Sequence, residues 1–94
     1  MLLDHRPHTL GARRKWIIDY SQWLAAGVTV VPVAFSATTT SLTATVDFVS
    51  TTATTLQFFL NGGIINEIFT VALQITDSTG EVKHDTIEFF VVAP

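Results

Sequence analysis

Apolar and polar side chains alternate through the second half of the chain, in short runs that turn signals separate. From Leu42 to Phe48 the even-numbered residues are apolar and the residues between them are polar, and the same period of two returns in 56–60 and 69–76. Successive side chains of a strand point to opposite faces, so this period predicts half-buried strands rather than helices. We therefore expect Leu42 and Phe48 to point into a core. Residues typical of strands (Thr, Val, Ile and the aromatics) fill 42 of the 94 positions.

Turn residues divide the chain into six or seven expected strands. Asn61-Gly62-Gly63 and the segment 77–80 are typical of tight turns, because Asn and Gly tolerate positive φ and Asp accepts hydrogen bonds within a turn. Pro32 cannot donate to a ladder, so the strand that contains it is expected at a sheet edge, with a bulge near Val30-Val31. We predict an all-β fold, a two-sheet antiparallel sandwich. The expected strands are 16–18, 28–35, 42–49, 56–60, 69–76 and 82–92, with a loop over 36–41.

Positive charge is concentrated at the start of the chain. Residues 1–15 carry a net charge of +3, whereas residues 16–94 carry −6. We expect an extended basic arm over 1–14 and a single sandwich domain over 15–94. Such an arm suits an acidic protein surface or the acidic body of a neighbouring copy, and a frayed terminus without function is the alternative. Nucleic acid is not an expected partner, because no aromatic residues are interleaved with these charges. The candidate contact residues are Arg6, Arg13, Arg14 and Lys15.

The chain is poor in charge and contains no cysteine. Charged residues are 14% of the chain, against about 25% in an ordinary globular domain, which suits a protein that hides surface in an assembly. Without cysteine there are neither disulfides nor thiolate metal sites. The longest apolar stretch, 23–35, is too interrupted and too short to span a bilayer, and the first residues lack the apolar core of a signal peptide. We expect a soluble protein without a membrane partner.

No residue pattern indicates catalysis. A proline separates His5 from His8 and disfavours the helix that would bring them onto one face, so we expect both to be solvated. His84 is expected to make a surface contact between strands. No serine has the surroundings of a nucleophile elbow, and no two carboxylates are spaced as acid and base. We expect no enzyme, no cofactor and no bound metal; a calcium site at Asp77 and Glu81 would have too few oxygen ligands nearby.

Apolar side chains on the expected outer faces are the candidates for protein contact. Phe59 falls on the face opposite Phe58, and Phe90 on the face opposite Phe89. Exposed together, such side chains would form an apolar patch of the kind that marks an interface. The alternative is that the second sheet and the segment 16–23 bury them. The candidates are Phe59, Ile64, Ile65 and Phe90.

Several of these stretches are similar to a family of small tailed-phage virion proteins, the fibre–tail adaptors. Members show Asp-aromatic-Ser-x-Trp-Leu followed two residues later by Gly, and a later strand that ends before a Gly pair. The matching stretches here are Asp19-Tyr20-Ser21-Gln22-Trp23-Leu24 with Gly27, Leu60-Asn61-Gly62-Gly63, Phe69-Thr70-Val71, Ile75-Thr76, Gly80 and 87–92. The chain departs from the family in having Val28 after Gly27 and Asn66 where a third Gly is frequent, although Asn also tolerates a left-handed backbone.

The resemblance implies a small immunoglobulin-like sandwich with an N-terminal arm, and a non-enzymatic structural protein of the phage virion. Such a protein would join the tail or neck to a fibre or spike, in many symmetric copies that assemble in the host cytoplasm. The arm would order on a neighbouring subunit. A capsid decoration or cement protein is the first alternative. A carbohydrate-binding sandwich is the second, with Trp16, Tyr20 and Trp23 as its aromatic platform.

Overall fold

The computed structural model describes residues 2–94, and the side chains of that range apart from 2, 3 and 32–34. Seven strands make up the regular secondary structure of the described residues, and none of these residues lies in a helix long and apolar enough to cross a membrane. The strands are β1 (Leu2–Thr9), β2 (Arg13–Asp19), β3 (Val30–Thr39), β4 (Ala44–Thr51), β5 (Thr55–Gly62), β6 (Ile68–Asp77) and β7 (Val82–Val92).

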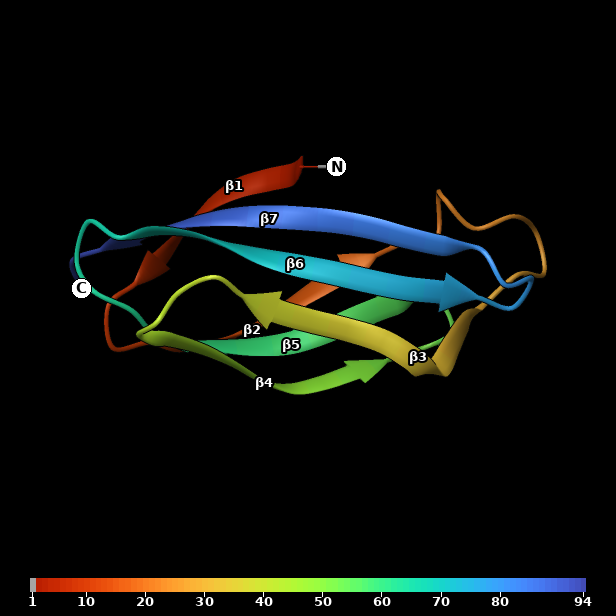
Figure 1. Ribbon diagram of the computed structural model, residues 1–94, viewed down its shortest axis with the longest axis horizontal. Coiled ribbons are helices and arrows are strands. Elements are labelled where there is room, and N and C mark those ends of the chain that lie inside the picture. The colour runs from red at the N-terminus through yellow and green to blue at the C-terminus, as the bar shows by residue number, and fades with distance from the viewer. Residues whose placement is uncertain (1) are drawn as a thin grey trace.

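The strands form two sheets that face each other (Figure 1), one in the order β1-β7-β6-β3 and the other in the order β2-β5-β4. Strands β2, β5 and β4 in one sheet and β3, β6 and β7 in the other follow the strand order of immunoglobulin-like sandwiches, although β1 joins β7 rather than β2. The predicted all-β, two-sheet sandwich is therefore confirmed, and its strand order is consistent with an immunoglobulin-like form. One pairing departs from the antiparallel expectation: β1 lies beside β7 and runs parallel to it.

The segment predicted as an arm contributes to both sheets. Residues 2–9 are extended as β1, and the backbone then crosses to the other layer, where β2 begins. The crossing is fixed by hydrogen bonds from the Leu10 amide to the Val92 carbonyl (2.9 Å) and from the Ala12 amide to the Thr9 carbonyl (3.0 Å). The expectation of two solvated arm histidines is wrong for His8, which is 1% exposed, because the alternation of β1 points it between the sheets.

The core lies between the sheets and comes mainly from the three central strands. In β5, β6 and β7 every second side chain is buried, as the period of two predicts. Phe89 stands at its centre, with the Phe69 ring stacked against it at 5.7 Å and the Trp16 ring edge-on at 5.1 Å. The completely buried side chains of these strands include Leu56, Phe58, Leu60, Val71, Leu73, Ile75 and Phe89.

Strand β4 breaks the predicted alternation. Ala44 is buried as expected, but Phe48 is 71% exposed and Leu42, which lies in the loop before the strand, is 100% exposed. The pairing with β5 shifts register between Asp47 and Ser50, and Phe48 at this bulge has a φ of 48°. The extra residue of a bulge reverses which side chains face inward, so the inward prediction for Phe48 is wrong.

Strand β3 is an edge strand, as predicted from Pro32, and its pairing with β6 is irregular between Val30 and Phe35, the region of the expected bulge. The loop expected over 36–41 is shorter than predicted. Ser36 and the residues up to Thr39 pair with β6, because Thr and Ser side chains are as compatible with an edge strand as with a loop.

The turn predicted at 77–80 has the expected chemistry. In it the Gly80 amide donates to the Asp77 carbonyl (3.0 Å), and the Asp77 carboxylate accepts from the amides of Thr79 and Glu81. The turn predicted at 61–63 is wrong, because Asn61 and Gly62 pair with β4 as the last residues of β5 and the chain turns at 65–66. Gly62 has a φ of 80°, and a Cβ there would lie 2.7 Å from the Thr43 carbonyl oxygen, so only glycine fits.

Candidate functional site

The outer face of the β2-β5-β4 sheet carries two aromatic rings and two cationic side chains, Phe48, Phe59, Arg13 and Lys15, which we call the aromatic–cationic patch. The Arg13 guanidinium carbon lies 3.9 Å from the centre of the Phe59 ring and 5.0 Å from that of Phe48. The rings meet edge to face, with centroids 6.1 Å apart. Stacking on two rings and an ion pair with Asp47 (3.3 Å) hold the Arg13 side chain against the sheet.

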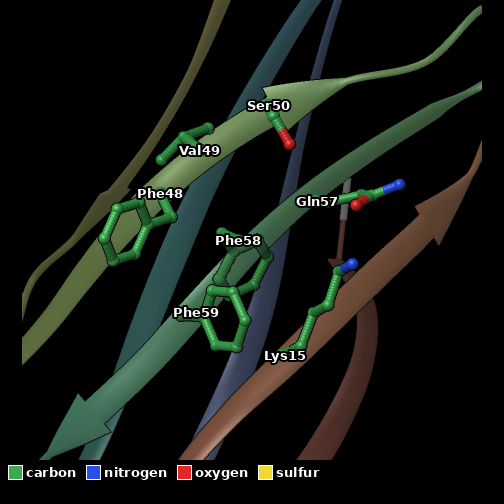
Figure 2. Close-up of a pocket in the computed structure, with 7 residues that line it drawn as sticks. All are labelled: Lys15, Phe48, Val49, Ser50, Gln57, Phe58 and Phe59. Atoms are coloured by element: carbon green, nitrogen blue, oxygen red, sulfur yellow. The ribbon is translucent and has the colours of Figure 1, made fainter.

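A hollow of about 350 Å³ opens beside these rings. Figure 2 shows the Phe48 and Phe59 rings on one side of it, while the Lys15 side chain extends along β2 towards Gln57. Val49, Ser50 and Phe58 complete its lining. Lys15 has no ion-pair partner among the residues that the structure describes, so the hollow combines an apolar wall with an uncompensated positive charge.

The backbone at Phe48 is unfavourable for a bulky residue. A left-handed conformation costs a residue other than glycine about 1–2 kcal/mol, and for an aromatic residue it is an outlier. The residue held in this conformation presents its ring to solvent. Backbone outliers of this kind gather at functional positions, where the surrounding structure keeps them in place.

The opposite sheet presents a second patch on its outer face, in which two apolar side chains lie beside a carboxylate. It is formed by Ile68, Phe90 and Glu88, and we call it the Ile68–Phe90–Glu88 patch. Ile68 on β6 pairs directly with Phe90 on β7, and Ile68 is 65% exposed. The His5 ring from β1 stacks on Phe90 with centroids 4.6 Å apart, and its Nδ1 contacts the Glu88 carboxylate. Phe90 is therefore half-buried, and the cover comes from β1 rather than from the second sheet.

The loop at one end of the sandwich presents a third group of apolar side chains. Ile64 and Ile65 are exposed between β5 and β6, and Leu42 is exposed between β3 and β4. The Glu67 carboxylate ties the two loops together, because it accepts from the Ser41 hydroxyl (2.7 Å) in one and from the Ile64 amide (3.2 Å) in the other. These hydrogen bonds, that of Ser41 above all, lower the pKa of Glu67.

The candidate contact residues predicted from the sequence thus fall in separate places. Arg13, Lys15 and Phe59 come together on one face, Phe90 lies on the opposite face, and Ile64 and Ile65 lie at the end loop. The remaining two lie on the strands that follow one another at the start of the chain. Arg6 pairs with Asp4 at a groove of about 300 Å³, and the Arg14 guanidinium lies 5.0 Å from the centre of the Trp16 ring.

Sequence reasoning missed Phe48, Leu42 and Ile68. Phe48 and Leu42 continue a clean alternation, and no residue at 47–50 is a glycine that would mark the bulge. Ile68 comes directly before the predicted strand 69–76, and extending the alternation of that strand by one residue would have placed Ile68 on its outer face.

The aromatic platform required for carbohydrate binding is not formed. Tyr20 is buried and Trp16 packs against the core, which leaves Trp23 with 37% exposure. Trp23 lies at the surface, with the Lys83 ammonium 5.4 Å from its ring centre. The three aromatic side chains therefore do not form the exposed platform that the carbohydrate-binding alternative requires.

Three polar side chains, those of His8, Tyr20 and Asp85, are buried in the sandwich. Burial lowers the pKa of His8 between the sheets, and burial, with the nearby Asp85 charge, raises the pKa of Tyr20. Asp85 is 2% exposed and lies 3.4 Å from the Lys83 ammonium. Within the described residues, no three His, Asp or Glu side chains gather in a way that would hold a metal ion.

The family model described as "Podophage GP4 fiber-tail adaptor protein gp77" matches residues 9–89. The match covers most of the chain, from the end of β1 to the middle of β7. No curated protein matches the chain.

Proposed function

Because the chain belongs to the family described as podophage GP4 fiber-tail adaptor protein gp77, we propose that it joins the tail or neck of a phage particle to a fibre or spike. Its role is structural, as a component of the virion. It acts through protein–protein contacts, without catalysis, in symmetric copies that assemble in the host cytoplasm. The observation that carries the proposal is the family match over residues 9–89.

The surface of the sandwich supports a role in assembly. Large apolar side chains stand exposed on both outer faces and at one end of the sandwich, and apolar side chains that gather into exposed patches mark protein contacts. Phe48, Ile68 and Leu42, which are 71%, 65% and 100% exposed, are the most prominent. Contacts on several sides are what an adaptor between two larger structures requires.

The arm over residues 1–14 is the second part of the proposal. In the single chain its first segment, β1, pairs in parallel with β7 along one edge of the sheet. An edge strand that joins the domain through a short crossing at Gly11 can make the same pairing on the β7 of a neighbouring copy. We propose that this exchange is how the arm orders on a neighbouring subunit in the particle.

Antibody-gold electron microscopy of phage particles tests the location. Label at the neck or tail supports the adaptor role. Label spread over the head would favour capsid decoration, and particles without label would overturn a virion role altogether.

Removal of β1 tests the arm. Particles assembled with a chain that lacks residues 1–9 are expected to lose the protein, whereas a chain with Thr9→Ser keeps β1 and serves as the matched control. Undiminished incorporation of the truncated chain would exclude the arm from assembly.

A further inference from the structure

The two outer faces of the sandwich are complementary to each other. We propose that the aromatic–cationic patch on the β2-β5-β4 sheet of one copy packs against the Ile68–Phe90–Glu88 patch on the β1-β7-β6-β3 sheet of a second copy. This inference rests on the proposed function, since it names the surfaces through which copies of the adaptor meet. It concerns the isolated chain, however, and is tested without the phage.

Charge favours this pairing of faces over the alternatives. The Lys15 ammonium lacks an ion-pair partner among the described residues. Glu88 on the opposite face is 35% exposed, and within the described part of the chain its carboxylate forms an ion pair with His5 alone. Packing the aromatic–cationic patch against its own copy would bring two Lys15 ammonium groups into one contact, whereas the charge of Arg13 is compensated by Asp47. Packing the opposite patch against its own copy would bring two Glu88 carboxylates together. Like charges at an interface disfavour such two-fold pairings, and the pairing of unlike faces removes the conflict.

Apolar complementarity points the same way. The hollow beside Phe48 and Phe59 has an apolar wall, and the opposite face offers the exposed Ile68 side chain next to the half-buried Phe90 ring. Burial of the Phe48 ring in the contact would use the side chain that the strained backbone holds in solvent.

The faces are large enough for a specific contact. The molecule extends 42 × 22 × 19 Å, so its broad faces offer an area comparable to the roughly 800 Å² that each partner buries in a standard interface. The other side chains on the two faces are mostly neutral, such as Gln57 on one and Thr70 and Thr86 on the other, which keeps the cost of desolvation low. A contact between unlike faces repeats from copy to copy, and closes into a ring if the rotation between copies allows.

Sedimentation velocity and light scattering on the purified full chain measure the association, up to about 1 mM so that millimolar contacts are detected. We expect the apparent mass to rise with concentration. Lys15→Glu and Glu88→Lys should each weaken association by about tenfold or more, because each places like charges in the contact. The double variant Lys15→Glu/Glu88→Lys should associate again, since it reverses both charges. The two single variants, mixed, should associate again in alternating order, because every contact between unlike variants joins a lysine to a glutamate.

Phe48→Asn tests the apolar part, because Asn tolerates the left-handed backbone and this relief offsets the loss of the ring contacts with Phe59 and Arg13. It should weaken association by about tenfold or more while thermal unfolding is maintained. Glu81→Lys and Leu42→Thr are the matched controls, a charge reversal and a loss of an exposed apolar side chain outside both faces, and neither should change association.

A chain that stays monomeric at about 1 mM would overturn the inference. So would association that is lost with Leu42→Thr but unchanged in Phe48→Asn, which would place the contact at the end loop. Failure of the double variant to recover would exclude the pairing of Lys15 with Glu88. If the purified chain does not self-associate but gold label is found at the neck, this inference alone is overturned. If the chain self-associates but particles carry no label, the proposed function alone is overturned.

Discussion

Replacement of Phe48 by Gly and by Ala measures how much the backbone is strained at the bulge. Both variants lose the same ring contacts with Phe59 and Arg13, so the difference between them reports the backbone alone. At a φ of 48°, Ala bears a penalty of about 1–2 kcal/mol that Gly avoids. Gly loses about 0.5–1 kcal/mol of unfolding free energy to its greater chain entropy. The Gly variant should therefore be the more stable of the two, by roughly 0.5–1 kcal/mol.

Thr45 supplies the matched control on the same strand. It is exposed, regularly paired with Asn61, and free of the bulge. Gly should be less stable than Ala there by about 0.5–1 kcal/mol, the usual order for a strand. The two differences have opposite signs, and their sum isolates the left-handed penalty at about 1–2 kcal/mol.

Urea unfolding followed by the fluorescence of Trp16 and Trp23 gives the four free energies, provided that the m-values agree. In a domain of this size each 1 kcal/mol also shifts Tm by about 4–8 °C, which makes thermal unfolding a second readout. If Ala is more stable than Gly at position 48 by the same margin as at Thr45, the backbone at Phe48 is not left-handed. The argument that the fold holds this ring outward against strain would then fail.

Three further predictions concern the fold. Gly62→Ala should cost more than about 2 kcal/mol of unfolding free energy, because alanine there would have to adopt a φ of 80° and its Cβ would also clash with the Thr43 carbonyl oxygen. Gly80→Ala has open space around it and should cost only about 1 kcal/mol, so equal losses in urea unfolding would contradict the close approach at Gly62. Burial lowers the pKa of His8, so as pH falls below the ordinary value of 6.5 the unfolded chain takes up a proton before the folded chain does, and the unfolding free energy should decrease. His8→Leu should make the unfolding free energy nearly independent of pH in this range, and an unchanged dependence on pH would exclude His8 as its cause. Burial raises the pKa of Tyr20, so its contribution to the unfolding free energy should be fully present below the ordinary value of 10.0 and should be lost as pH rises above it. Tyr20→Phe should remove that decrease, and a decrease that persists in the variant would assign the loss to other groups.

Much of the candidate site was accessible from the sequence as separate residues but not as a surface. Parity placed Phe59 and Phe90 on outer faces, where the structure has them. Residue spacing along the chain could not show that β2 brings Arg13 onto the Phe59 ring, because that contact joins strands more than forty residues apart. Phe48 completes the same surface, and its position depends on a bulge that leaves no mark in the alternation.

The sequence alone determined the class of fold and most of the core. Period-two alternation in β5, β6 and β7 is a local property of each strand, so the buried residues from Leu56 to Val91 follow from it without knowledge of the partners. The positive φ of Gly62, Gly63 and Gly80 is equally local, since it depends on which residues accept that backbone conformation. The turn that was expected at 61–63 nevertheless comes later, at 65–66.

The tertiary structure decided the features that depend on pairing. β1 lies along β7 and carries His8 into the core, although a short polar segment with a proline has no local signal for a parallel edge strand. The register shift in β4 turns Phe48 outward, because only the pairing with β5 determines where an extra residue is accommodated. The unlike faces that this packing creates, one with Lys15 and two rings and the other with Glu88 and Ile68, exist only once seven strands from distant parts of the chain lie in two layers.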